Sequence, residues 1–127
     1  TLMIREYMMK DISNTRKILK PWGYEEIWAE TKDYVGKIIH INANNRLSRQ
    51  YHEIKEETIR VISGKLLVEV GSSEDRIEKI HMKVGESFHV KPNTIHRFCA
   101  TDTDVQLVEV STPQLDDVVR VEDDYKR

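Results

Sequence analysis

The sequence predicts an all-β protein folded as a closed barrel or jelly roll, and three observations support this prediction. Short segments rich in β-branched and aromatic residues recur at even spacing, with Gly, Asn, Asp and Pro between them. About nine such segments lie between residues 23 and 111, which is typical of a sheet that closes on itself. At 127 residues, the chain is long enough for one domain with a hydrophobic core that needs no disulfide or metal staple.

The predicted elements follow one another along the chain. Residues 1–19 carry apolar side chains at irregular spacing and are predicted to form an N-terminal arm or a helix, ahead of a single barrel domain at 20–127. In GYEEIWAE (23–30), apolar and polar residues alternate as in a strand with one buried face. The acidic tail at 116–127 has an apolar stripe and is predicted to be a strand or a short helix. The predicted strands are 23–30, 35–42, 47–52, 58–63, 65–70, 76–82, 86–90, 94–100 and 105–111.

Composition narrows the function classes. The net charge is −2, from 20 basic and 22 acidic residues that are well mixed, and no basic stripe with interleaved aromatics suggests nucleic-acid binding. No run of about 18 apolar residues predicts a membrane span or a signal segment. Cys99 is the only cysteine, so no internal disulfide is possible, which fits a reducing compartment. We therefore expect a cytoplasmic protein without nucleic-acid or membrane partners.

Metal-ligating side chains interrupt one predicted hairpin. In LSRQYHEIKEETIRVISG (47–64), Gln50 and His52 point to the same face of a strand, because successive side chains alternate. Glu57 lies five positions after His52, so in one continuous strand it would point to the opposite face. A turn at residues 53–56 would let it point to the same face as His52. The three side chains would then point into the barrel. An ordinary polar hairpin is the alternative interpretation.

One hairpin cannot close a coordination sphere, so another ligand is expected from a different strand. The candidates are His81, His89 and His96, with His40 less favoured. His96 stands out because it follows KPN (91–93), where Asn can adopt the left-handed conformation that a tight turn needs.

These residues carry a family resemblance. The pattern of Gln50, His52, Glu57 and Gly64 resembles the first motif of the cupin superfamily, with Gln in place of the first His. Gly85, Pro92 and His96 look like the second motif. The resemblance implies a double-stranded β-helix that holds one divalent metal ion through Gln50, His52, Glu57 and His96.

Two further segments resemble the cupin domain of type II mannose-6-phosphate isomerases. KPWGYEEIW (20–28) is similar to the opening of that domain, and LDDVVRVEDDYKR (115–127) is similar to its closing segment. Where the family has glycines in turns, this chain has Asn44 or Asn45, Asn93 and Lys126. It also has Ile54 where the family's isomerases often carry histidine.

The resemblance implies a metal-dependent aldose–ketose isomerase of a sugar or sugar phosphate. Zinc fits the mixed nitrogen and oxygen ligands best, and manganese, iron, cobalt and nickel also fit. Lys55, Glu57 and Arg120 are the predicted catalytic residues. The predicted contacts to the sugar or its phosphate are Lys55, Arg49, Arg97 and Arg120.

Two alternatives stay open. Ile54 and the unassigned proton-transfer group favour a non-catalytic, metal-containing cupin that binds a sugar or another small ligand. An iron-dependent dioxygenase is less favoured because Gln50 replaces a histidine. The resemblance also implies a homodimer, with residues 1–19 as an arm that could be exchanged between subunits.

Overall fold

The computed structural model describes residues 1–9 and 12–127 as one helix and eleven strands. The helix α1 spans Leu2–Met9 and buries no side chain. The strands are β1 (Arg16–Lys20), β2 (Gly23–Glu30), β3 (Val35–Ile41), β4 (Arg49–Tyr51), β5 (Glu57–Ser63), β6 (Leu66–Gly71), β7 (Ile77–Met82), β8 (Ser87–Val90), β9 (Ile95–Ala100), β10 (Val105–Ser111) and β11 (Val119–Glu122).

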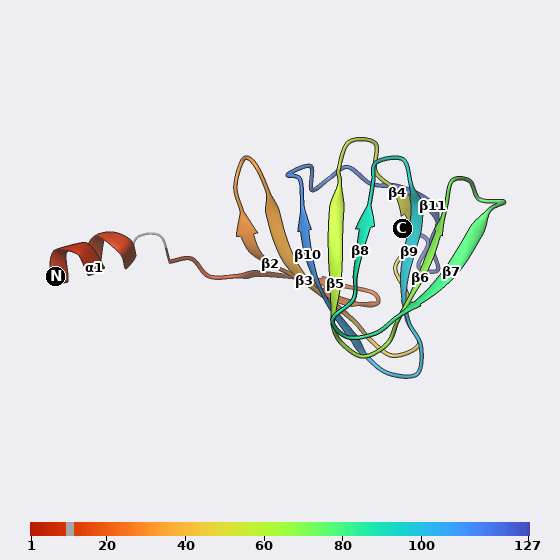
Figure 1. Ribbon diagram of the computed structural model, residues 1–127, viewed down its shortest axis with the longest axis horizontal. Helices are drawn as coiled ribbons and strands as arrows, with labels where there is room; N and C mark the ends of the chain where they lie inside the picture. Colours follow the sequence, from red (N-terminus) through yellow and green to blue (C-terminus); the bar gives the residue numbers. More distant parts are fainter. Residues whose placement is uncertain (10–11) are drawn as a thin grey trace.

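The strands form two antiparallel sheets (Figure 1). One sheet has the order β1-β2-β3-β10-β5-β8, and the other has the order β11-β4-β9-β6-β7. Most consecutive strands from β3 onward lie in different sheets, so residues distant in sequence become neighbours. The predicted all-β architecture is therefore confirmed.

The hydrophobic core lies between the sheets. On β5, burial alternates so that Glu57, Ile59 and Val61 face inward, while Arg60 points to solvent. The same alternation on the other strands gives a core cluster that also contains Trp22, Ile39, Ile41, Leu66, Val68, Phe98 and Leu107. Glu57 thus enters the interior on the same face as the apolar residues that anchor its strand.

Three turns place a residue other than glycine in the left-handed backbone region. The non-glycine residues with positive φ are Asn44 at 63°, Asn93 at 62° and Lys126 at 54°, within the described part of the chain. These are positions at which the family resemblance led us to expect glycine. Asn tolerates this backbone conformation better than most residues do, whereas a lysine there is uncommon. Gly64 keeps a φ of 81°, and a side chain at that position would collide with the carbonyl oxygen of Asp104.

The ends of the described chain differ in how they join the barrel. β1 begins at Arg16, inside the segment predicted to be an arm, and pairs with β2 along its whole length. The boundary between arm and barrel at residue 20 stays a prediction. In the tail, β11 resolves the two alternatives in favour of a strand, since it pairs with β4. In the described ranges 1–9 and 12–127, no helix has the length and apolar character needed to cross a membrane.

Candidate metal centre

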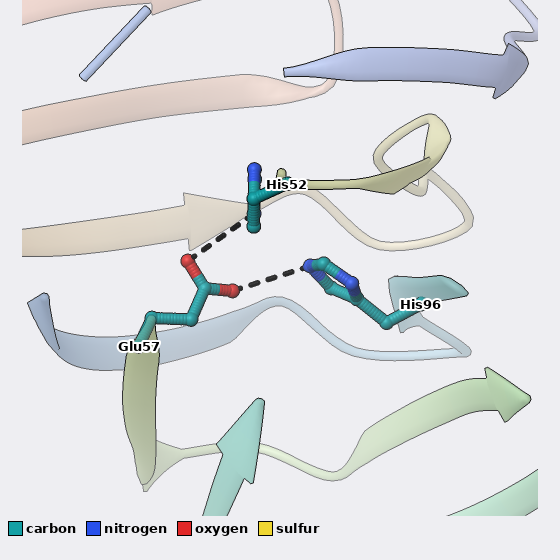
Figure 2. Close-up of side chains that lie close together, drawn as sticks. All are labelled: His52, Glu57 and His96. Atoms are coloured by element: carbon teal, nitrogen blue, oxygen red, sulfur yellow. Dashed lines mark ion pairs between the residues drawn. The ribbon is translucent and has the colours of Figure 1, made fainter. Parts of the chain in front are cut away.

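Three potential metal ligands converge inside the barrel (Figure 2). One ligand atom from each of His52, Glu57 and His96 lies within 4.8 Å of the others, and all three residues are buried. The Nε2 atom of His96 lies 3.2 Å from Glu57 Oε1, and that of His52 lies 3.6 Å from Glu57 Oε2. A buried cluster of two imidazoles and one carboxylate has the donor chemistry of a divalent metal site.

The local fold explains why these side chains meet. His52 follows β4 directly, and the irregular segment at 53–56 changes the phase of the chain before Glu57 opens β5. β4 pairs with β9 so that Gln50 lies opposite His96. Gln50 lines the cavity beside these residues, and its Oε1 atom accepts a hydrogen bond from Ser48 Oγ at 3.2 Å. The turn predicted at 53–56 therefore lies where the parity argument requires it.

Backbone contacts fix the orientation of both imidazoles. His52 Nδ1 lies 2.6 Å from the carbonyl oxygen of Asp117, and His96 Nδ1 lies 2.9 Å from that of Thr94. A carbonyl oxygen only accepts hydrogen bonds, so Nδ1 of each ring carries the proton and Nε2 presents a lone pair. Neither Nε2 atom has a hydrogen-bond partner among the described residues. Two buried lone pairs that face one carboxylate fit a bound divalent ion.

Glu57 also contacts a buried lysine, which in turn contacts a second buried glutamate. Lys55 Nζ lies 2.9 Å from Glu57 Oε2 and 3.3 Å from Glu109 Oε2, and all three residues are buried. Burial opposes ionisation of Glu57, but the Lys55 ammonium 2.9 Å from its carboxylate favours it. The pKa of Glu57 therefore lies well below its ordinary value.

The two partners of Glu57 are shifted in the opposite direction. Burial raises the pKa of Glu109 to about 7, with a further contribution from the negative charge of Glu57. Burial lowers the pKa of Lys55, but Glu109 and Glu57 outweigh this, so the net shift is upward. Lys55 is consequently a permanent cation and hydrogen-bond donor.

The cluster lies beside a cavity of about 100 Å³. Metal-site residues and the buried charges form its inner wall, and the tail and the end of β1 contribute its cationic part. Among the lining residues are Lys20, Gln50, His52, Lys55, Glu57, Glu109, Arg120 and Arg127. Arg127 pairs with Asp123, whereas Lys20 and Arg120 have no ion-pair partner in the part of the chain that the structure describes. The cavity thus combines buried carboxylate–lysine pairs with two cations that have no ion-pair partner among residues 1–9 and 12–127.

The predicted substrate contacts divide into two groups. Lys55 and Arg120 line the cavity, but Arg49 and Arg97 do not. Arg49 binds Glu69 at 2.6 Å and Glu122 at 3.0 Å. Arg97 is fully buried and donates to the carbonyl oxygens of Leu47 and Glu122. Both arginines stand one position from an inward-facing residue, so strand alternation directs them to the opposite face of the sheet.

The other histidines lie outside the cluster. His89 pairs with Glu56 at 2.6 Å on the surface, and His81 is exposed on β7. His40, the less favoured candidate ligand, stacks on Tyr24 with ring centroids 4.9 Å apart. Sequence reasoning did not identify Glu109, Lys37 or Asp117 as part of the site, because their positions depend on strand pairing across the barrel.

Asp117 holds the ligand-bearing loop in place. Its carboxylate accepts hydrogen bonds from the backbone N–H groups of Glu53, Ile54 and Lys55 at 2.7–3.0 Å. These three bonds lower the pKa of Asp117 to about 2. Because the folded-state value is depressed, the stabilisation is complete above the ordinary value near 4 and is lost as the pH falls through about 2.

Replacing Asp117 with alanine is therefore expected to loosen the loop without unfolding the barrel. Amide hydrogen exchange at residues 53–55 should become faster in Asp117→Ala, since their N–H groups lose their acceptors. The neighbouring Asp116→Ala variant is the control, because that carboxylate makes no such contact among the described residues. Unchanged exchange at the three amides would mean that the carboxylate does not order this loop.

Comparison with known proteins agrees with the fold. The sequence model of the family described as mannose-6-phosphate isomerase C-terminal matches residues 8–123. No curated protein matches the chain. Among solved structures, KdgF from Halomonas sp. is similar with a TM-score of 0.69 and 20% identity, covering 82% of this chain and 91% of that one.

Two longer proteins contain a similar domain. The capsular polysaccharide assembling protein CapF from Staphylococcus aureus has a TM-score of 0.72 and 16% identity, over 87% of this chain and 35% of that one. Oxalate decarboxylase from Bacillus subtilis has a TM-score of 0.75 and 12% identity, over 85% and 30%. The chain thus spans about a third of each. At these identities the likenesses concern the fold alone, and they confirm the predicted cupin barrel.

Proposed function

Since the chain belongs to the mannose-6-phosphate isomerase C-terminal family, we propose that it is a metal-dependent isomerase that interconverts the aldose and ketose forms of a sugar or sugar phosphate. The observation that carries the proposal is that the Nε2 atoms of His52 and His96 face the Glu57 carboxylate in the barrel interior and have no hydrogen-bond partner in the described part of the chain. Gln50, on the same wall, would supply the fourth ligand. Zinc suits this ligand set best, and manganese, iron, cobalt and nickel also suit it.

Different residues of the cavity would contact the metal, the sugar oxygens and the phosphate group. Gln50, His52, Glu57 and His96 would hold the divalent ion, which would supply Lewis acidity toward a sugar carbonyl group. Lys55, fixed between two carboxylates, donates a hydrogen bond to a substrate oxygen and stabilises negative charge that develops there. Arg120 and Lys20, which line the cavity, attract the phosphate group of a phosphorylated substrate.

A non-catalytic sugar-binding cupin is the second candidate. Ile54 stands where the family's isomerases often carry histidine, and its side chain is exposed on the loop between the ligands. A small sugar ligand is common to both candidates. The predicted homodimer and cytoplasmic location remain proposals, and the exposed apolar residues of α1 are compatible with a partner subunit.

We expect metal-loaded protein to isomerise mannose 6-phosphate or another aldose phosphate, and Glu57→Gln to lower kcat/KM at least about 100-fold through loss of a ligand. Coupled assays over a panel of aldose and ketose phosphates measure the rate. Glu56→Gln is the matched control, because Glu56 belongs to the same loop but contacts His89 at the surface. Binding without turnover across the panel would favour the non-catalytic candidate.

A further inference from the structure

Five charged side chains form a continuous row from the metal centre to the far wall of the cavity. Lys55 joins Glu57 to Glu109, and Lys37 continues the row, with Nζ 3.8 Å from Glu109 Oε2 and 3.4 Å from Glu25 Oε2. The four side chains other than Glu25 are almost fully buried, and Glu25 is 15% exposed. Buried ion pairs often contribute little net stability, so such a row in a cavity wall points to a role in binding.

Glu109 is the member of the row with unused hydrogen-bonding capacity. It lies on the inward face of β10, lines the cavity and is 2% exposed. Lys55 Nζ and Lys37 Nζ approach its Oε2 atom, but among the described residues no donor meets that atom in hydrogen-bond geometry. The two ammonium groups balance the charge of Oε2 without a well-aligned hydrogen bond, so a ligand hydroxyl that donates to this atom gains free energy.

We propose that Glu109 is a specificity-determining residue that accepts a hydrogen bond from one hydroxyl group of a polyhydroxylated ligand. The proposal rests on the proposed function for its ligand class. Lys55 Nζ lies within 3.3 Å of both Glu57 and Glu109, so a small sugar that reaches the metal centre also reaches Glu109. Carboxylate and phosphate groups offer acceptors only and would leave Oε2 unpaired.

The arrangement also orients the ligand. Its hydroxyl-bearing end meets Glu109, whereas an anionic end meets Arg120 and Lys20, which have no ion-pair partner in the described ranges. A short dicarboxylate cannot satisfy both parts of the cavity, because it has no hydroxyl donor for Glu109. The cavity thus selects a polyol that carries at most one anionic end.

The test is a cycle that combines variants of the protein with deletions of single hydroxyl groups from the ligand. Calorimetry measures binding to the metal-loaded protein of mannose 6-phosphate, its monodeoxy analogues, and unphosphorylated mannose and fructose. The protein should bind the parent sugar about ten times more tightly than one of the analogues, as expected when a buried acceptor loses its donor. Glu109→Met should bind that parent and analogue equally, since the discrimination requires both groups.

Further variants separate this contact from a change of charge or of fold. Glu26→Met removes a carboxylate from the same strand that neither lines the cavity nor belongs to the row, and it should keep the tenfold discrimination. Glu109→Gln keeps one acceptor oxygen and should keep part of the discrimination between the parent sugar and its analogue. Metal content and melting temperature are measured for each variant, and Glu109→Gln decides the question if Glu109→Met does not fold.

The outcomes distinguish this inference from the proposed function. Hydroxyl-dependent binding that requires Glu109, without turnover, supports the inference and removes the isomerase. If the protein isomerises the sugar, but the wild type and both Glu109 variants discriminate equally between the parent sugar and its analogues, the inference is overturned and the proposed isomerase activity stands. If the wild-type protein binds no sugar of the panel, or binds all the analogues as tightly as their parent, the assignment of Glu109 is overturned.

Discussion

Replacing His96 with alanine is expected to abolish stoichiometric metal binding. Wild-type protein should carry about one divalent ion per chain, with an affinity at least about 100-fold higher than that of the variant, because loss of a ligand costs more than loss of an outer partner. His96 is fully buried, and its Nε2 atom has no other hydrogen-bond partner in the described structure. Elemental analysis of both purified proteins measures the metal directly and identifies the element.

The matched control is His81→Ala, which removes an exposed imidazole from β7 and should leave the metal content unchanged. Equal metal in the wild-type and His96→Ala proteins would place the ion elsewhere. No metal in either protein, even after incubation with zinc, manganese, iron, cobalt or nickel, would mean that His52, Glu57 and His96 form a structural polar cluster. The protein would then be better described as a binding module.

Replacing Lys55 is expected to lower the stability of the folded protein. Lys55→Met should destabilise the metal-free protein by about 3–5 kcal/mol, because it leaves the Glu57 and Glu109 carboxylates buried without the cation between them. Urea unfolding at constant metal-free conditions measures the free energy difference. Lys79→Met, an exposed change on β7, should alter stability by less than about 0.5 kcal/mol.

The stability that Lys55→Met loses relative to the wild type, its deficit, should depend on pH in a definite direction. The pKa of Glu109 is raised by burial to about 7 in the folded protein, so folding takes up a proton between about pH 4.5 and pH 7. Loss of the Lys55 cation raises the pKa of Glu109 further in the variant, so lowering the pH to and through about 7 should reduce the deficit of Lys55→Met, since a protonated Glu109 no longer needs a cation. A deficit that does not vary with pH would show that lost packing of the lysine stem, rather than charge, causes the destabilisation.

The sequence supported the prediction of the fold and the positions of the candidate ligands, because both depend on local patterns. Alternation within strands and the turn between His52 and Glu57 are sufficient to direct these side chains inward. The same alternation also argues against Arg49 as a cavity residue, since it immediately precedes Gln50. Applying the parity argument to the arginines would have separated Arg49 from the candidates that line the cavity.

Other parts of the site depend on pairings that no local pattern specifies. Glu109 reaches Lys55 only because β10 lies beside β5 in the sheet. Asp117 reaches the loop at 53–55 from a segment more than 60 positions further along the chain. The short β1 has two apolar residues and gains its strand character from β2, so its sequence alone resembled an irregular arm.

The late position of Asp117 and Arg120 in the sequence has a consequence for the order in which the site is assembled during synthesis. The predicted ligands lie between residues 50 and 96, so a ribosome synthesises all of them before it adds the residue that orients His52. During that interval the nascent chain has its imidazoles and carboxylate but neither the cap on the ligand loop nor the cationic wall of the cavity. The orientation of His52 is therefore expected only after residues 117–120 have been added, so the predicted metal site is completed later in synthesis than its ligands.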